Sequence, residues 1–335
     1  MSTVRWGVLT TARIAQSRFL PAAGRASGAA VVAISSTSGR AEEVAGRFGI
    51  PAAYGSHEEL LADPGVEAVY VPFPNSLHAE WALRAVEAGK HVLCEKPLVA
   101  SADELAHLAE AAARRGVKVM EAFMYRFHPQ HAKVRELLDS GRIGDVVSIH
   151  ARFHFAMDRQ PGEPRLKPGF DGGALNDIGC YGVDALNRLM DAPPRSVYAR
   201  GTSHSDPVET SMAAILDYGG VLATIDCGFE GPLTNTLQII GTLGHITLDK
   251  AFDPDPTETA NVTVASRSGA AETFAFTGDA FQAEIEQFSE WTRSDGPTMP
   301  FQELTQRSLA VRVALHASLA SGQPQAVIPA DAVVG

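Results

Sequence analysis

Short apolar runs alternate with amphipathic stretches over the first third of the chain. The stretches have apolar residues at three- and four-residue spacing, which predicts helices, and two of them stop at Gly49 and Gly89, as helices commonly do. The apolar runs predict strands at 4–9, 30–35, 68–71, 91–94 and 117–121. Such alternation of strand and helix is typical of a parallel sheet with crossover helices.

The pattern changes after residue 122. Apolar runs separated by glycine-rich turns predict strands at 146–155, 196–200, 211–217, 221–229, 236–241 and 245–249. Helices are predicted at 131–138, 177–189, 280–291 and 304–321. A succession of strands without intervening helices favours an antiparallel or mixed sheet made of consecutive hairpins.

We therefore predict the α/β fold class, with two domains. Residues 1–122 form a Rossmann-like, doubly wound parallel sheet, and residues 123–335 form a second α/β domain with a large, open, mostly antiparallel sheet. The C-terminal helix could pack back on the first domain. A chain of 335 residues, 45% of them hydrophobic, is long enough for two cores.

Composition and charge narrow the range of partners. The net charge of −11, without a cluster of lysine and arginine, argues against nucleic acid. No stretch approaches the ~18 apolar residues of a membrane span, and no apolar leader precedes the first strand. Three widely spaced cysteines offer no zinc-binding pattern, so we predict no metal and a reducing, cytoplasmic location.

The turn after the first strand is similar to a dinucleotide-binding fingerprint. Small residues there allow a tight turn and let the next helix point its amino end at a pyrophosphate. Gly7 is retained, Thr10 stands where the second glycine is expected, and Ala12 stands near the third. The pattern is degenerate, and an ordinary strand-turn-helix is the alternative. The predicted cofactor-binding residues here are Gly7, Thr10, Thr11, Ala12, Arg13 and Ile14.

The segment after the second strand bears on the choice of cofactor. The acidic residue that would bind an adenine-ribose 2′-hydroxyl is missing, and Ser36, Thr37 and Arg40 stand there instead. Hydroxyls and a guanidinium can bind a 2′-phosphate that an acid would repel, so we expect NADP(H) rather than NAD(H). The alternative is that Ser36 or Ser38 only caps the next helix.

The strand at 91–94 stops on Glu95-Lys96-Pro97. Open α/β folds bind ligands at the carboxyl edge of the sheet, so Lys96 is a candidate catalytic residue. Pro97 disfavours helical dihedrals at Lys96 and favours an extended conformation. The alternative is a solvated Lys–Glu pair at the end of a strand.

Five segments resemble, in the same order, the motifs of one oxidoreductase family. They lie at 7–15, 74–78, 89–97, 120–129 and 172–181. On these motifs the chain is similar to the glucose-fructose oxidoreductase/inositol dehydrogenase (Gfo/Idh/MocA) family. The resemblance implies a nucleotide-binding Rossmann domain and contact of Lys96 with the reacting hydroxyl or carbonyl. It also implies cofactor contacts at Pro72, Asn75, His78, Glu95, Lys96 and Arg126, although Arg126 could instead hold the seam between the domains.

Tyr181 stands where many members of this family carry histidine. Tyrosine there resembles the branch of glucose-fructose oxidoreductase, dimeric dihydrodiol dehydrogenase, D-xylose dehydrogenase and sugar ketoreductases. An ammonium beside a phenol favours the phenolate, so Tyr181 could exchange a proton with a substrate oxygen that Lys96 polarises. A buried ring with a satisfied hydroxyl is the alternative. Asp177 could orient Lys96, bind a sugar hydroxyl or cap a helix, and His154 could either pack or face substrate.

We expect an NADP(H)-dependent oxidoreductase that moves a hydride between nicotinamide and a sugar-like alcohol or carbonyl. A trans-dihydrodiol dehydrogenase is the alternative among enzymes. A non-catalytic nucleotide-sensing regulator is the alternative of another class, and Lys96 and Tyr181 both argue against it. The expected partners are a carbohydrate-like substrate and further copies of the chain, as a homodimer or homotetramer, because an open sheet leaves an apolar face. The residues identify neither the sugar nor the direction of the reaction.

Overall fold

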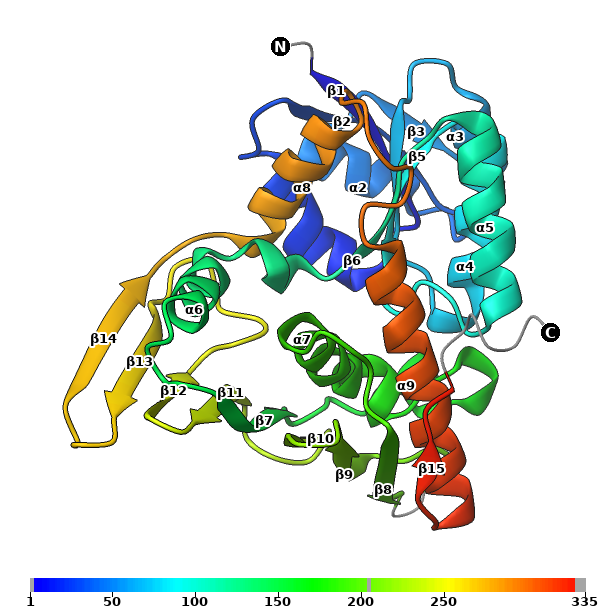
Figure 1. Ribbon diagram of the computed structural model, residues 1–335. Coiled ribbons are helices and arrows are strands. Elements are labelled where there is room, and N and C mark those ends of the chain that lie inside the picture. Colours follow the sequence, from blue (N-terminus) through cyan, green and yellow to red (C-terminus); the bar gives the residue numbers. More distant parts are fainter. Residues whose placement is uncertain (1–2, 204–205, 329–335) are drawn as a thin grey trace. The chain divides into compact units, whose positions relative to one another are not determined.

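The computed structural model describes residues 3–203 and 206–328 (Figure 1). The chain divides into two units. Unit 1 comprises Met1–Phe127 and Ala280–Gln302, and unit 2 comprises His128–Asp279 and Glu303–Gly335. Unit 1 is therefore discontinuous in sequence, because Ala280–Gln302 returns to it after the strands of unit 2.

Unit 1 is built on a six-stranded parallel sheet with the order β3-β2-β1-β4-β5-β6. Its strands are β1 (Val4–Leu9), β2 (Ala29–Ser35), β3 (Ala52–Tyr54), β4 (Ala68–Val71), β5 (His91–Glu95) and β6 (Val119–Ala122). All neighbouring pairs run parallel. The strand order reverses between β1 and β4, which confirms the predicted doubly wound, Rossmann-like topology.

Helices cover both faces of this sheet (Figure 1). One face carries η1 (Ala15–Phe19), α1 (Leu20–Ala23), α2 (Ala41–Phe48) and α8 (Ala280–Trp291), and the other carries α3 (His57–Ala62), α4 (His78–Glu87) and α5 (Ala102–Arg115). Successive residues of β1 show the alternation between the faces. Trp6 packs against the rings of Phe19 and Phe288, whereas Gly7 faces Leu60 of α3.

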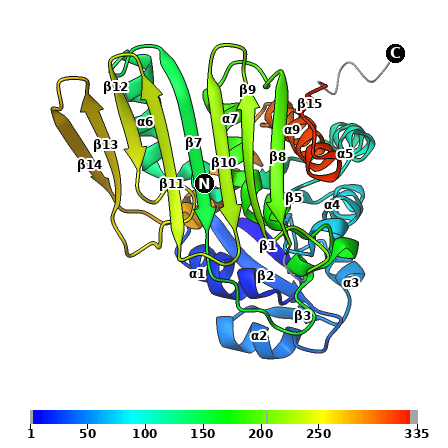
Figure 2. The same cartoon turned by 90° about the horizontal axis from the view of Figure 1, so that it is seen from below.

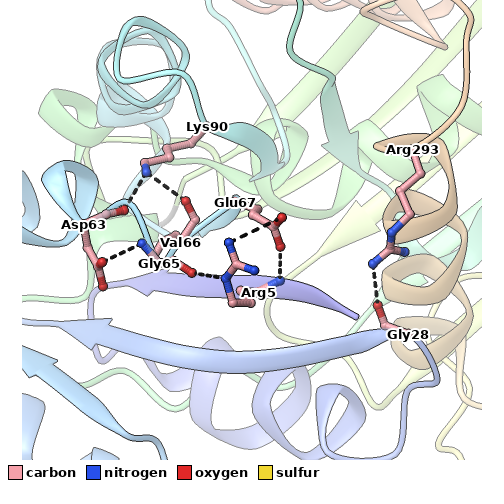
Figure 3. A network of polar contacts seen from close by, with 8 residues as sticks. All are labelled: Arg5, Gly28, Asp63, Gly65, Val66, Glu67, Lys90 and Arg293. Atoms are coloured by element: carbon pink, nitrogen blue, oxygen red, sulfur yellow. Dashed lines mark hydrogen bonds and ion pairs between the residues drawn. The ribbon is translucent and has the colours of Figure 1, made fainter. Parts of the chain in front are cut away.

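Polar contacts tie the amino ends of the strands together (Figure 3). Lys90, just before β5, donates from Nζ to the carbonyl oxygens of Asp63 (2.7 Å) and Val66 (2.8 Å). Arg5 of β1 donates its backbone N–H to Glu67 Oε2 (2.9 Å), and its guanidinium lies 3.5 Å from the same carboxylate. Structural contacts occupy this edge, which leaves the carboxyl edge of the sheet for ligands.

Unit 2 is built on a nine-stranded sheet with the order β14-β13-β12-β11-β7-β10-β9-β8-β15. Its strands are β7 (Val146–His154), β8 (Ser196–Thr202), β9 (Ser211–Asp217), β10 (Leu222–Gly228), β11 (Thr234–Gly241), β12 (Gly244–Leu248), β13 (Ala260–Ser266), β14 (Ala271–Phe276) and β15 (Gln325–Ala326). Only β7 and β10 pair in parallel, and the other pairs among the described residues are antiparallel. The predicted second α/β domain with a mostly antiparallel sheet is confirmed.

One face of the sheet in unit 2 is covered and the other is open. The covered face carries α6 (Pro129–Asp139), α7 (Cys180–Leu189) and, beside β8, α9 (Gln302–Ser321). Figure 2 looks onto the other face, where no helix of unit 2 lies in front of the central strands. Tyr198, Ile215 and Leu222 are between 36% and 55% exposed there. We call these three side chains the open-face patch.

The structure differs from the sequence-based prediction at several elements, for physical reasons. β3 is a three-residue strand without a β-branched residue, and β13 and β14 mix apolar with threonine, asparagine and glutamate positions, so none of the three is predicted. The hairpin succession is interrupted, because β7 inserts between β10 and β11. The helix predicted at 177–189 begins earlier, as a π-helical turn, η6 (Leu175–Gly179), that runs into α7. Among the described residues, no helix is both long and apolar enough to cross a membrane.

Candidate active site

The turn after β1 has the backbone shape of a glycine turn, although threonine occupies it. Thr10 has a φ of 82°, in the left-handed region that non-glycine residues rarely adopt. Its N–H donates to Ser35 O (3.1 Å), and its hydroxyl accepts from the N–H of Ala12 (3.1 Å). The hydroxyl therefore stabilises a strained conformation from within the turn. Thr10 thus adopts the backbone conformation expected of the second fingerprint glycine, but it has a larger side chain.

Gly7 lies within β1 and not in the turn itself. A Cβ added there would lie 2.7 Å from Leu60 Cδ2 and 3.0 Å from Val66 Cγ1. Close packing of β1 on α3 therefore explains this glycine, and its contact with a cofactor stays a prediction. The other predicted residues of the turn differ in exposure: Thr11 is buried, Ala12 and Ile14 are half-buried, and Arg13 is exposed.

A chain of hydroxyl contacts joins this turn to the end of β2. Ser36 is buried, and its Oγ lies 2.8 Å from Ser38 Oγ and 3.4 Å from Thr11 Oγ1. Arg40 donates from Nε to Ser38 Oγ (3.2 Å) and is exposed, as is Thr37. Arg40 itself occupies the N-cap of α2, and no side chain caps that helix, so the alternative in which Ser36 or Ser38 only caps it is wrong.

A cavity of about 520 Å³ opens beside these two turns. Arg13, Arg40 and Arg47 line it together with Thr11 and Gln16, and none of its lining residues is acidic. Arg47, at the end of α2, donates a hydrogen bond to Gln16 Oε1 and so bridges α2 and η1. Guanidinium groups are the preferred partners of phosphate oxygens. The residues of this cavity therefore fit the phosphate-bearing end of a dinucleotide.

β5 ends at Glu95, and Lys96 follows at the carboxyl edge of the sheet. The hydroxyl of Tyr70, on neighbouring β4, donates to Glu95 Oε1 (2.5 Å). The ring of Tyr70 stacks on Phe19 with a centroid separation of 3.9 Å. Glu95 and Lys96 are both half-buried, and the peptide bond from Lys96 to Pro97 is cis. A stacked aromatic pair thus holds Glu95, the residue that precedes Lys96.

His78 braces the segment that follows Lys96. Its Nδ1 lies 2.8 Å from Pro97 O, its Nε2 lies 2.7 Å from Phe73 O, and its side chain is buried. Burial lowers the pKa of His78 to about 4, so near neutral pH the ring carries one proton and donates to one of these carbonyls. Both ring nitrogens face the backbone, which gives His78 a positioning role on the turn at Pro97.

The remaining predicted residues of unit 1 lie near the same edge. Arg126, on η3 (Met124–Phe127), is buried, and its guanidinium lies 4.7 Å from the ring centroids of both Phe123 and Phe301. Pro72 follows β4 and is buried, and Asn75 begins the half-turn η2 (Asn75–Leu77). Arg126 is thus fixed between two aromatic rings of unit 1.

In unit 2, Tyr181 is the second residue of α7 and is 6% exposed. Its ring meets Phe153 of β7 edge-on at 5.4 Å and lies 5.9 Å from the ring of Phe252. Asn235 holds the loop of Phe252, because its Oδ1 accepts from the Phe252 N–H (2.6 Å). The phenol is thus held by a wall of two phenylalanines.

Asp177 lies in the π-helical turn that precedes Tyr181. Its Oδ2 lies 3.7 Å from Arg165 Nη1, and Arg165 also makes a two-pronged contact with Glu163. Gly173 sets the start of this turn with a φ of 107°, and a Cβ there would lie 2.4 Å from Glu209 Oε1. The turn brings Asp177 and the loop residue Arg165 to the amino end of the helix that carries Tyr181.

His154 lies on the other face of the sheet from Tyr181. It follows Phe153 on β7, and successive strand residues point to opposite faces. Its Nε2 lies 3.0 Å from Asp226 Oδ1 on β10. The structure therefore gives His154 a cross-strand role and not a place beside the phenol.

Four polar residues that lie close to the predicted site residues were not predicted from the sequence. They are Arg47 at the cavity, Tyr70 beneath Glu95, Glu209 beside Gly173, and Glu284 on α8. Only Glu284 had a visible signal, because an acidic residue stands in its apolar stripe of Phe281, Ile285 and Phe288. Among the described residues, no group of three or more His, Cys, Asp or Glu side chains could hold a metal ion.

Two family profiles match this chain. The profile of the oxidoreductase family with an NAD-binding Rossmann fold (GFO_IDH_MocA) matches residues 4–123, and that of the GFO/IDH/MocA C-terminal domain matches residues 131–247. The chain belongs to the GFO/IDH/MocA oxidoreductase family. The predicted family is thereby confirmed, and so is its consequence that the chain is an oxidoreductase with a nicotinamide dinucleotide cofactor.

Individual relatives within the family match most of the chain. D-xylose 1-dehydrogenase (NADP(+)) 2 of Haloferax volcanii is 41% identical over 287 residues, which are 85% of this chain and 87% of that protein. Mouse trans-1,2-dihydrobenzene-1,2-diol dehydrogenase is 35% identical over 259 residues, 75% of this chain and 76% of that protein. The crystal structure of KijD10, a 3-ketoreductase of Actinomadura kijaniata, with NADP and TDP-benzene has a TM-score of 0.87 at 34% identity, and the match covers 95% and 98% of the two chains. These proteins are a D-xylose dehydrogenase, a dihydrodiol dehydrogenase and a 3-ketoreductase, which are among the enzymes that the tyrosine at position 181 predicts.

Proposed function

We propose that this protein is an NADP(H)-dependent oxidoreductase of sugars or sugar-like alcohols and ketones. The observation that carries the proposal is the position of Lys96 at the carboxyl end of β5, on the same sheet edge as the turns that line the arginine-rich cavity. Relatives named for xylose oxidation and for reduction of a ketosugar support the substrate class.

The preference for the phosphorylated cofactor rests on charge. Arg13, Arg40 and Arg47 present three cations around one cavity, and the Ser36 hydroxyl lies 3.4 Å from that of Thr11, which also lines it. A ribose 2′-phosphate would gain charge-assisted hydrogen bonds there, whereas a 2′-hydroxyl would leave the guanidiniums without an anionic partner. The names of a relative and of a structural neighbour, both with NADP, support the same preference.

The proposed chemistry divides the work between two side chains. When bound, the nicotinamide supplies or accepts the hydride. Lys96 holds a positive charge toward the substrate oxygen and stabilises the negative charge that develops on it during reduction. Tyr181 exchanges a proton with that oxygen, and Phe153 and Phe252 hold its ring in place. Asp177, paired with Arg165, binds a sugar hydroxyl.

A second candidate substrate class comes from the surroundings of Tyr181. Phe153, which is 8% exposed and meets the Tyr181 ring edge-on, gives the phenol an apolar neighbour that suits the ring of an aromatic trans-dihydrodiol as well as the apolar face of a sugar. Asp177 and Arg165 are the polar counterpart, and they favour the sugar. We therefore rank the carbohydrate first.

A substrate screen tests the proposal. Purified protein is assayed with aldoses, ketosugars and a trans-dihydrodiol, and both NADPH consumption and NADP⁺ reduction are followed by absorbance. We expect turnover with at least one carbohydrate and tighter binding of NADP(H) than of NAD(H). Turnover of the dihydrodiol alone would favour the second candidate, and cofactor binding without turnover of any compound would favour a nucleotide-sensing regulator.

We also propose that the protein is a cytoplasmic homo-oligomer. The open-face patch is the reason for the oligomer, because its apolar side chains lie on a sheet face that unit 2 leaves uncovered. The cytoplasmic location rests on the cysteines, since Cys94, Cys180 and Cys227 form no disulfide. Tyr198 and Ile215 are paired across β8 and β9, so one substitution reaches the middle of the patch. In sedimentation, Ile215→Lys should give a smaller species than the native protein. Leu243→Lys, at an exposed apolar residue in the β11–β12 turn, is the control and should sediment as the native protein does.

A further inference from the structure

Unit 1 buries an acidic side chain that the proposed chemistry does not use. Glu284 lies on α8 with a relative exposure of 0%, in line with Phe281 and Phe288. Neither of its carboxyl oxygens has a hydrogen-bond partner among the residues that the structure describes. A carboxylate buried in this way is strongly unfavourable, so Glu284 is held as a neutral carboxylic acid.

The charges around Glu284 are few and fixed. Burial is the main cause that raises its pKa, Glu95 raises it further, and Arg126 lowers it. Arg126 is carried by η3, which packs on α8, and is clamped between two phenylalanine rings. The other elements packed on α8 are η1, α1, β2 and β1. η1 carries Arg18, η3 also carries Tyr125, and β1 carries the exposed Arg5, whereas α1 and β2 carry no ionisable side chain.

Glu95 connects this buried acid to the edge where the reaction would occur. It is half-buried, it accepts a hydrogen bond from Tyr70, and it directly precedes Lys96. A positive charge that arrives at this edge favours the ionised form of nearby carboxyl groups. Glu284 is a neutral carboxyl near this edge, because the charge of Glu95 raises its pKa and because α8 packs on η3, the turn that follows β6.

We propose that Glu284 is a proton-release group of the dinucleotide-binding unit, which loses its proton when the cationic, oxidised nicotinamide binds and keeps it when the neutral, reduced form binds. The proton leaves the carboxyl O–H and passes to the buffer, and no other bond changes. The proposal rests on the proposed function, because it requires that the protein binds NADP⁺ and NADPH. Its consequence is that the local charge around Lys96 is the same with either form of the cofactor.

Calorimetric titration of the cofactor-free protein tests the proposal without any turnover. NADP⁺, NADPH and adenosine 2′,5′-bisphosphate are titrated in two buffers with different ionisation enthalpies, so that protons released on binding are counted. We expect release with NADP⁺ only. The Kd for NADP⁺ should fall as pH rises, by at most about tenfold per pH unit, the limit for one proton, while the Kd for NADPH stays level.

Variants assign the proton to its source. Glu284→Gln keeps the shape of the neutral acid and should abolish both the proton release and the pH dependence of the Kd for NADP⁺. Glu290→Gln, at an exposed acid on the same helix, should keep both, and Tyr181→Phe should also keep both. As a check that needs no variant, the infrared band of a protonated carboxylic acid should disappear with NADP⁺ and remain with NADPH.

Each outcome decides one question. Undiminished release from Glu284→Gln, or its loss in Tyr181→Phe, would overturn the assignment to Glu284. Absence of release, or an unchanged carboxylic-acid band, in native protein that binds NADP⁺ would overturn the inference and leave the proposed function intact. Failure of both NADP⁺ and NADPH to bind would overturn the proposed function itself.

Discussion

The sheets of the two units expose different parts of their strands. In unit 1 helices cover both faces, and β4 is buried along its whole length, so this strand can offer side chains to a ligand only beyond its ends. In unit 2 one face is open, and β9 alternates between buried and exposed side chains along its length. The comparison teaches that a sheet covered by helices on both faces can place functional side chains only at an edge. A sheet covered on one face can also offer its other face to a partner.

The largest effect should come from the two residues proposed to act on the substrate oxygen, one in each unit. Lys96→Met and Tyr181→Phe should each lower kcat about a hundred- to ten-thousandfold and change cofactor affinity little, because neither is needed for the phosphates. The double variant should lose less than the product of the two losses, since a shared oxygen couples them. NADPH absorbance measures turnover, and fluorescence titration measures cofactor binding.

Unchanged turnover in Tyr181→Phe would move the proton exchange to Asp177 or to water. Unchanged turnover in Lys96→Met would leave the strand end of unit 1 with a solvated charge pair and no catalytic role.

Acid should loosen the edge of unit 1 through His78. Its pKa is about 4 in the folded chain, below the ordinary value of 6.5, so the unfolded chain binds the proton first as pH falls. The stabilising contribution is therefore complete above about pH 6.5 and is lost toward pH 4, with a magnitude of about 3 kcal/mol. The melting temperature of His78→Gln should depend less on pH across this window than that of the native chain. His107→Gln, at an exposed histidine of α5, should follow the native curve.

Cofactor choice should change with the strand-end cations of unit 1. Arg40→Ala should weaken NADP(H) about tenfold, about 1.4 kcal/mol, and leave NAD(H) nearly unchanged, because Arg40 is exposed and would contact only the extra phosphate. Fluorescence titration with both cofactors gives the ratio. Equal weakening of NAD(H) and NADP(H) would contradict the role of Arg40 in reading the 2′-phosphate.

The smallest expected effect is a difference in stability between a substitution in the covered sheet of unit 1 and one on the open face of unit 2. Gly7→Ala places a methyl group 2.7 Å from Leu60 Cδ2, and should cost about 1 kcal/mol because the end of the leucine side chain can shift. Ala213→Val adds carbon to the exposed face of β9 and should change stability by less than about 0.5 kcal/mol. Melting temperatures compare the two, and an equal loss in both would show that the open face is as closely packed as the covered one.

The sequence predicts well what depends on local pattern. β1 and β4 are predicted to the residue, and the apolar runs of unit 1 suffice for its topology because parallel strands need crossover helices. The insertion of β7 between β10 and β11 cannot be read from the sequence pattern of any one strand. It depends on which strands pair after distant parts of the chain have come together. At the site, the positions of Thr10 and Lys96 follow from strand ends. The contact of Tyr70 with Glu95 joins residues 25 apart on neighbouring strands, and the pattern of either strand alone does not reveal it.

The return of α8 to unit 1 has a consequence for the order in which the chain is made. Trp6 of β1 donates to Ser289 Oγ of α8 across 283 residues. At typical synthesis rates of roughly 5–20 residues per second, the first strand therefore leaves the ribosome roughly 15–60 s before the helix that completes its core. During that interval the apolar surface around Trp6 and Phe19 is not covered by α8, and we expect a chaperone to bind it. Residues 1–127 expressed alone should aggregate, whereas the same residues fused by a short linker to 280–302 should give a chain that can close its own core.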